Sequence, residues 1–311
     1  MSSIQSIKRD GLRKLVDLCM LLLLLCLMAY QVTGEEKHEW TGIVMTLTVL
    51  LHQYLNRRWY AALFKGRYNA YRSVTTAVNL LLLASMLVTA FCGMSMSEYA
   101  VPFLYWARGL MVVRPAHLAM SHWSFVLMGL HLSLHVPLML GRMKDSARSI
   151  LTAVGAVIAG VGLWLFLRNG MPNYLFFRVP FAFLDYEKAF WLVFLENTLM
   201  LSTWVFLGAE LAVLCMKRKK KPALILGSAA AAAVLGLVLN TAFPGDNDLD
   251  FDAAWNVPEA QPAEAAYTPE PLAESAAPAE LNDGFVLIPA GRSGLSANVS
   301  ARLEKNNIEH G

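Results

Sequence analysis

Charged residues are scarce in this chain. Asp, Glu, Lys and Arg make up only 16% of its 311 residues, whereas 56% are hydrophobic, and the mean hydropathy is +0.45. This balance excludes an ordinary soluble protein and is typical of an integral membrane protein. We therefore expect membrane lipid, and no nucleic acid, among its partners.

Cysteine is also scarce and provides no structural framework. The sequence contains four cysteines, at Cys19, Cys26, Cys92 and Cys215. All four fall in or beside apolar runs, so we interpret them as small apolar residues. The sequence has no C-x-x-C-H motif, which excludes the covalent attachment of a c-type haem.

Long apolar runs, in contrast, dominate the chain. A run of about 18 mainly apolar residues is long enough to cross a bilayer as an α-helix. Seven such runs occur, at 15–32, 39–57, 73–93, 115–140, 149–167, 189–215 and, rich in alanine, 223–243. In lipid the backbone must satisfy its own hydrogen bonds, and runs of this length do so as helices. The sequence predicts an all-α integral membrane helical bundle.

Lys and Arg are distributed unevenly between the connections of these runs. Seventeen lie before the first run and after the second, fourth and sixth, whereas six lie in the alternate connections. The positive-inside rule therefore predicts a multi-pass protein of the inner (cytoplasmic) membrane, with its amino terminus in the cytoplasm. With seven spans the carboxyl-terminal tail is extracytoplasmic, and with six it would be cytoplasmic.

The chain changes character at Pro244. From there to Gly311 it has twelve acidic residues and three Lys or Arg. We predict that 244–283 is an acidic, Pro/Ala-rich disordered linker. Residues 284–311 then form a short carboxyl-terminal segment of unknown role.

Histidines are few but clustered. Six of the seven belong to two of the predicted helices: His38 and His52 to the second, and His117, His122, His131 and His135 to the fourth. His310 lies in the tail. The interval of fourteen residues from His38 to His52 recurs from His117 to His131. Two helices therefore share one histidine spacing.

This interval has a geometric meaning. Fourteen residues of α-helix span about 21 Å, and both side chains stay within roughly 40° of one face. Since one span separates the two helices, they run in the same direction. His38 can then meet His117 near the outer surface, and His52 can meet His131 toward the cytoplasm. Two stacked pairs of this kind are what two b-type haems require, so we predict these four residues as axial ligands of haem iron.

Residues beside these four leave two questions open. His135 lies one turn beyond His131 and about 40° around the helix. The repeated interval favours His131 as the inner ligand and leaves His135 for a supporting or quinone-site role. Gly42 and Gly129 would make room for a flat macrocycle, although helix packing explains small residues equally well.

Part of the chain also resembles a known family. The resemblance is carried by HEWTGIVMTLTVLLHQYLNRRWYAALFKGRYN and RPAHLAMSHWSFVLMGLHLSLH, within about residues 11–140. Both segments are similar to the flavinylation-associated cytochromes, which are themselves similar to cytochrome b and formate-dehydrogenase membrane-subunit bundles. The matching positions are His38, His52, His117, His131 and His135.

The resemblance implies a domain organisation and partners. It implies a cytochrome b-like, haem-binding four-helix core within 1–140. The apolar runs predict two or three additional transmembrane helices within 141–243, which are less typical of the family. It also implies haem b as the cofactor and electron exchange with flavin-bearing partners outside the cell.

We therefore expect a membrane b-type cytochrome with two haems. It would carry electrons across the membrane between quinol, or another donor, and an extracytoplasmic flavoprotein or reductase subunit. The protein would serve as an electron-transfer subunit of an oxidoreductase system, with no catalytic residue of its own.

A proton- or metal-handling transporter is the alternative, because intramembrane histidines also build proton relays. Glu196 and Glu210 are then the main carboxylates for proton movement. His131 and His135 could ligate zinc, but no Asp or Glu in the membrane is expected to complete that site.

Overall fold

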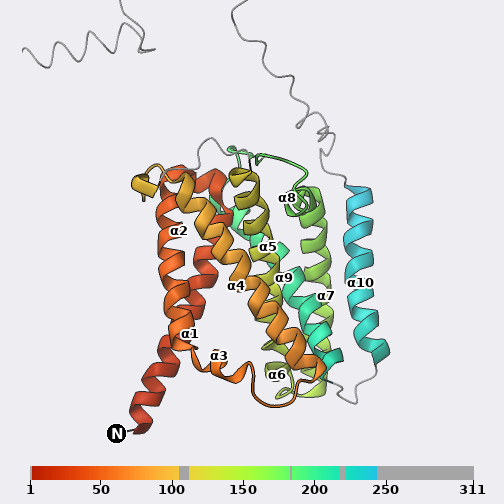
Figure 1. Ribbon diagram of the computed structural model, residues 1–311. Helices are drawn as coiled ribbons and strands as arrows, with labels where there is room; N and C mark the ends of the chain where they lie inside the picture. Colours follow the sequence, from red (N-terminus) through yellow and green to blue (C-terminus); the bar gives the residue numbers. More distant parts are fainter. Residues whose placement is uncertain (1, 105–111, 183, 217–221, 244–311) are drawn as a thin grey trace, which may run out of the picture. The chain divides into compact units, whose positions relative to one another are not determined.

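Helices account for all the regular structure that the computed structural model describes. It describes residues 2–104, 112–182, 184–216 and 222–243, and no strand occurs within them (Figure 1). The all-α prediction is confirmed for this part of the chain. The predicted linker at 244–283 and the segment at 284–311 lie outside the described residues.

A long helix coincides with each of the seven predicted apolar runs. These helices are α1 (Ser2–Met28), α2 (Tyr30–Leu55), α4 (Ala70–Met96), α5 (Val113–Ser133), α7 (Asp145–Arg168), α9 (Phe190–Cys215) and α10 (Pro222–Ala242). Short helices lie in the connections: α3 (Arg58–Ala62), η1 (Pro102–Leu104), α6 (Val136–Leu140) and α8 (Met171–Leu175). The helices of the predicted runs are thus confirmed.

Four segments are long and apolar enough to cross a membrane. They are α4, the stretch Val113–Leu140 that contains α5 and α6, α7 and α9, and they indicate a multi-pass membrane protein. Helix α10 has a shorter apolar stretch, Gly227–Ala242. Helices α1 and α2 are not among the four, since polar residues interrupt or flank their apolar runs. Their membrane crossing and the orientation of the bundle stay predictions.

Local sequence explains where several helices bend or end. Gly34 has φ +75° and kinks α2, a conformation that only glycine adopts at little cost. The side chain of Asn69 caps α4 by accepting a hydrogen bond from the Arg72 N–H at 2.8 Å. The predicted helix at 115–140 is divided, because α5 ends shortly before Pro137, which lacks a backbone N–H.

The long helices pack side by side in an alternating up-and-down order. Helix α1 packs on α2, α4 on α5, α5 on α9, α9 on α7 and α7 on α10. Short helices α3 and α6 lie at one end of the bundle and α8 at the other (Figure 1). Since α2 leads to α3 and α5 leads to α6, helices α2 and α5 run in the same direction, as predicted.

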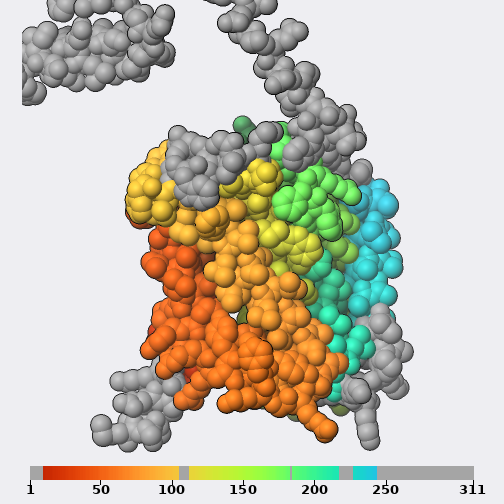
Figure 2. Space-filling model, viewed as in Figure 1, coloured from red at the N-terminus to blue at the C-terminus, as the bar shows by residue number. Residues whose placement is uncertain are grey.

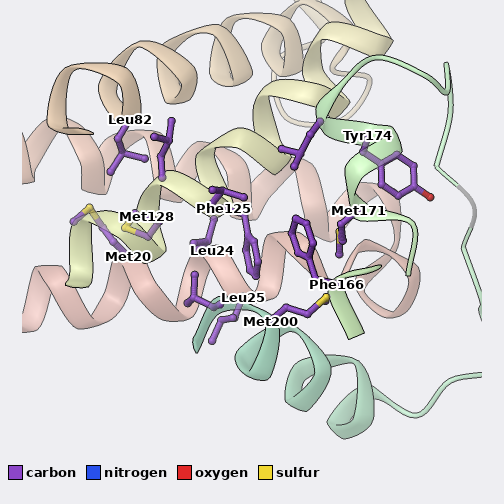
Figure 3. Packing of buried hydrophobic residues seen from close by; sticks show 14 of the residues in the cluster. Met20, Leu24, Leu25, Leu82, Phe125, Met128, Phe166, Met171, Tyr174 and Met200 are labelled. Atoms are coloured by element: carbon purple, nitrogen blue, oxygen red, sulfur yellow. The ribbon is translucent and has the colours of Figure 1, made fainter. Parts of the chain in front are cut away.

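The main hydrophobic core joins α1, α5, α7 and α9. It includes Met20, Leu24, Leu25, Phe125, Met128, Phe166 and Met200 (Figure 3). Phe125 and Met200 are each only 1% exposed. Burial of these large side chains stabilises α5 at the centre of the bundle. The histidines lie on other faces of α5.

Candidate functional site: two histidine pairs on α2 and α5

The first histidine pair lies near the beginnings of α2 and α5. The ring centroids of His38 and His117 are 6.2 Å apart, with ring planes at 75°. The ring of Tyr30 packs edge-on against His38 at 5.0 Å. The structure therefore brings together the first pair that the sequence predicts.

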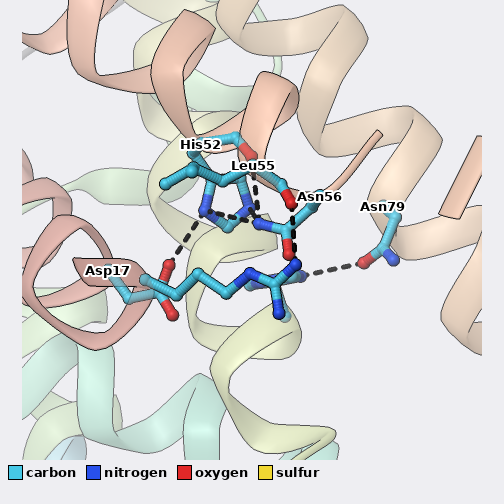
Figure 4. Close-up of polar contacts among 7 residues, drawn as sticks. Asp17, His52, Leu55, Asn56 and Asn79 are labelled. Atoms are coloured by element: carbon cyan, nitrogen blue, oxygen red, sulfur yellow. Dashed lines mark hydrogen bonds and ion pairs between the residues drawn. The ribbon is translucent and has the colours of Figure 1, made fainter. Parts of the chain in front are cut away.

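The second pair lies near the other ends of the same helices, in a polar cluster drawn in Figure 4. His52 donates from Nδ1 to the carboxylate of Asp17 on α1, at 2.9 Å. His131 donates from Nδ1 to the side-chain oxygen of Asn79 on α4, at 2.8 Å. His52 and Asp17 are both among the groups that act electrostatically on His131. The second pair and its hydrogen-bond partners thus come from four helices: α1, α2, α4 and α5.

The hydrogen bonds of these histidines fix where each ring carries its proton. His117 follows the same pattern as His52 and His131, since its Nδ1 donates to the Thr89 carbonyl at 2.9 Å. A carbonyl or carboxylate oxygen can only accept, so Nδ1 must hold the hydrogen in each ring. The Nε2 atom then carries a lone pair, which is the arrangement of a histidine that binds a metal.

His38 differs from the other three histidines. Its Nδ1 is buried and has no hydrogen-bond partner among the described residues. A buried polar atom without a partner costs free energy, on the order of 1–3 kcal/mol. A ligand bound at Nε2 would leave this Nδ1 atom without an acceptor, so His38 lacks the support that the Thr89 carbonyl gives to His117.

The spacing of the first pair fits a metal held between two imidazoles. A metal–nitrogen bond of about 2.0 Å, with about 1.1 Å more to the ring centre, places two opposed imidazole rings about 6.2 Å apart. The observed centroid distance of 6.2 Å equals this value. The two ring planes need not be parallel, because each only has to contain its own metal–nitrogen bond. The separation of the two rings therefore equals the one that a metal held between two opposed imidazoles requires.

The two glycines beside the predicted ligands have different surroundings. Gly42 lies one turn after His38, and a Cβ added to it would meet no atom within 4 Å. A narrow opening between α2 and α4 is visible in the lower half of Figure 2, toward the end of the bundle that contains α3. Gly129 is different, because its added Cβ would lie 2.6 Å from the Cβ of Trp204 on α9. Of the two explanations that the sequence leaves open for Gly129, the structure therefore favours helix packing.

A carboxylate anchors α2 beside the first pair. Glu39 accepts hydrogen bonds from the Ser97 hydroxyl at 2.7 Å and from the N–H groups of Glu98, Tyr99 and Ala100 at 2.9, 2.8 and 3.0 Å. These donors follow the end of α4. The contacts hold α2 against α4, and they thereby set the position of the neighbouring His38.

The two remaining helix histidines lie outside the pairs. His122 is buried, donates to the Leu118 carbonyl at 2.7 Å and stacks on Tyr174 of α8 at 4.7 Å. His135 is exposed, and its ring lies 5.9 Å from that of His131. The hydrogen bond to Asn79 belongs to His131, which supports His131 as the inner ligand.

Few features favour the transporter alternative. No group of three or more His, Cys, Asp or Glu side chains is arranged to hold a metal within the described ranges. Glu196 is 16% exposed, forms an ion pair with Lys188 at 3.1 Å and accepts from Asn169 at 3.3 Å. Glu210 also interacts within the protein. Both carboxylates that the sequence suggested for proton movement are therefore engaged in other contacts.

Sequence reasoning missed three residues that support the pairs: Asp17, Glu39 and Asn79. Asp17 is the single acidic residue within the run at 15–32, and Asn79 lies inside the run at 73–93. A polar residue inside an apolar run needs a partner, so these two positions carried a signal. Their partners could not be read from spacing because they lie on other helices.

Comparison of the chain with models of protein families, with curated proteins and with solved structures gives no match. The resemblance to flavinylation-associated cytochromes therefore rests on the two quoted segments. What the site can do must be argued from the geometry of its residues.

Proposed function

We propose that this protein is a membrane b-type cytochrome that binds two haems and carries electrons across the membrane. The observation that carries the proposal is the meeting of His38 with His117 at a ring separation of 6.2 Å. The supporting observation is the shared hydrogen-bond pattern of His52, His117 and His131. Helices α1, α2, α4 and α5 form the cytochrome b-like core of this proposal.

The protein residues position and tune the proposed ligands. Thr89, Asp17 and Asn79 accept from the Nδ1 atoms of three histidines, which orients Nε2 and raises the basicity of the ring. Glu39 holds the beginning of α2 through four hydrogen bonds. Haem, when bound, supplies one-electron redox chemistry at iron.

The two pairs lie at opposite ends of the same helices. The interval of fourteen residues corresponds to about 21 Å along an α-helix. With the amino terminus in the cytoplasm, as the positive-inside rule predicts, the pair His52 and His131 faces a donor such as quinol. The pair His38 and His117 then faces an extracytoplasmic acceptor, for which the family resemblance suggests a flavoprotein or reductase subunit.

The test compares two histidines of one helix. We expect purified protein to show low-spin b-type bands in a reduced-minus-oxidised spectrum, with about two haems per chain. His117→Ala should lose one of the two haems, because it removes one ligand of the first pair. His122→Ala should keep both, since His122 faces α8. Haem per chain, measured by extraction and absorbance, distinguishes the two variants.

Other results would contradict the proposal or correct it. Protein without haem from haem-sufficient cells would contradict it and would favour the transporter. Equal haem loss in both variants would contradict the assignment of His117. His131→Ala and His135→Ala test the inner ligand in the same way, and we expect only His131→Ala to lose haem.

A further inference from the structure

The connection between α2 and α4 is strongly basic. Residues 57–76, which comprise most of this connection and the first turns of α4, contain five Lys or Arg and no Asp or Glu. The short helix α3 and a turn at Gly66, with φ +78°, shape this connection. Its charge therefore has no acidic side chain nearby in the sequence to balance it.

A pocket of about 330 Å³ opens in this connection. Its lining includes three hydrogen-bond donors: the Lys65 ammonium, the Trp59 indole N–H and the Thr76 hydroxyl. None of the three donates to another described residue, and no carboxylate lines the pocket. Unpaired donors and a cation beside aromatic walls suit an anionic oxygen group.

The pocket is held in shape by Arg72 rather than by a ligand. The Arg72 guanidinium donates to the carbonyls of Ala62 and Lys65, both at 2.6 Å, and to that of Arg67 at 3.3 Å. It also lies 4.2 Å from the ring centre of Tyr68. Arg72 thus fixes the backbone at Lys65, whose own side chain remains available.

The neighbouring surface points to a lipid rather than a soluble anion. Phe64, directly before Lys65, is 95% exposed, and Tyr54 at the end of α2 is 62% exposed. Exposed aromatic rings next to cations are typical of the bilayer interface, where the ring contacts lipid and the charge contacts headgroups. The first turns of α4, which is one of the four candidate membrane spans, line part of the pocket.

We propose that this pocket binds the phosphate of an anionic membrane phospholipid. Lys65 provides the charge, Trp59 and Thr76 provide further donors, and Phe64 inserts beside the acyl chains. The site is independent of the histidine pairs, so it does not rest on the proposed electron transfer.

The test titrates the purified full chain with phosphatidylglycerol and counts bound lipid by native mass spectrometry. We expect one preferred lipid per chain. Lys65→Gln should weaken its binding about tenfold, because it removes a charge-assisted hydrogen bond. Trp59→Phe, which keeps a ring and loses the N–H, should weaken it less. The matched control is Lys144→Gln, a cation before α7 that does not line the pocket.

Each other outcome would overturn the proposal. Unchanged binding in Lys65→Gln would show that the pocket is not the lipid site. An equal loss in Lys144→Gln would show attraction by net charge alone. Inorganic phosphate at the same concentration should not displace the lipid, and full displacement would assign the pocket to a soluble phosphate instead.

Discussion

Small side chains join α7 to α9 and α10, whereas polar side chains join α1, α2, α4 and α5. In the first group, a Cβ added at Gly236 would lie 2.9 Å from Leu163. Ala159 is fully buried, and its carbonyl accepts from the Thr203 hydroxyl at 2.9 Å. These backbones approach closely, so van der Waals packing holds the group together.

The second group shares the apolar core and has polar contacts at its ends. Arg13 on α1 donates to the Leu55 carbonyl at the end of α2, at 2.9 Å. Tyr71 on α4 donates to the Leu134 carbonyl after α5, also at 2.9 Å. Between these contacts Gly42 faces open space, unlike the glycines of the first group.

The comparison teaches that the two groups differ in how closely their backbones approach and in which polar side chains join them. In the α7, α9 and α10 group the Thr203 hydroxyl bonds to a carbonyl, while Trp204 Nε1 and Asn240 Oδ1 are buried without a hydrogen-bond partner among the described residues. Three of the four paired histidines instead have Nδ1 bonded to oxygen, which leaves the opposite nitrogen for the proposed ligand. Helix α5 belongs to both groups, because Gly129 faces α9 while His117 and His131 bond to α4.

The largest expected change in stability comes from a glycine-to-alanine substitution, tested at one glycine from each group. A Cβ at Gly162 would overlap the Leu199 carbonyl oxygen of α9. Gly162→Ala should therefore lower the free energy of unfolding by about 3 kcal/mol. Gly42→Ala should leave the stability of haem-free protein unchanged or raise it by up to about 1 kcal/mol, since alanine favours helix. Thermal unfolding in detergent measures both.

Equal destabilisation by these two substitutions would contradict the difference in packing between the two groups. It would mean that the surroundings of Gly42 are packed as tightly as those of Gly162.

A smaller effect is expected where Glu39 anchors α2. Glu39→Gln removes the charge that four donors share, and should lower stability by about 2 kcal/mol. It should also reduce haem bound by the first pair. The matched control is Glu36→Gln, because Glu36 is exposed and makes no side-chain contact with other described residues. Unfolding and haem content are measured together, and a loss of haem from the second pair alone would contradict this role.

The smallest expected effect is on haem retention by the second pair, His52 and His131. Asp17→Asn keeps an acceptor oxygen for His52 but removes its charge. We expect haem retention by the second pair to weaken about tenfold, in the range that supporting residues contribute to metal affinity. Asp10→Asn is the control, since Asp10 pairs with Arg13, at 3.3 Å, and with no histidine among the described residues. If both variants behave alike, the Asp17 contact has no bearing on the ligand.

Much of the helical fold was predictable, because membrane helices need long apolar runs and the chain shows seven of them. The division after α5 was missed because one residue, Pro137, interrupts a run that is apolar throughout. Spacing along one helix could not decide between macrocycle space and helix packing at Gly129, because it does not show which neighbouring helix a residue faces.

The sequence by itself determined the helices, the repeated histidine interval and the shared direction of α2 and α5. These follow from local periodicity and from the alternation of spans. Only the tertiary structure decided which histidines meet, and that Asp17, Asn79 and the Thr89 carbonyl bond to them. The hydrogen bonds join different helices across as many as 52 residues of sequence, as between Asn79 and His131, and the pair of His38 and His117 is separated by more. Such pairings depend on how the helices rotate and pack against each other.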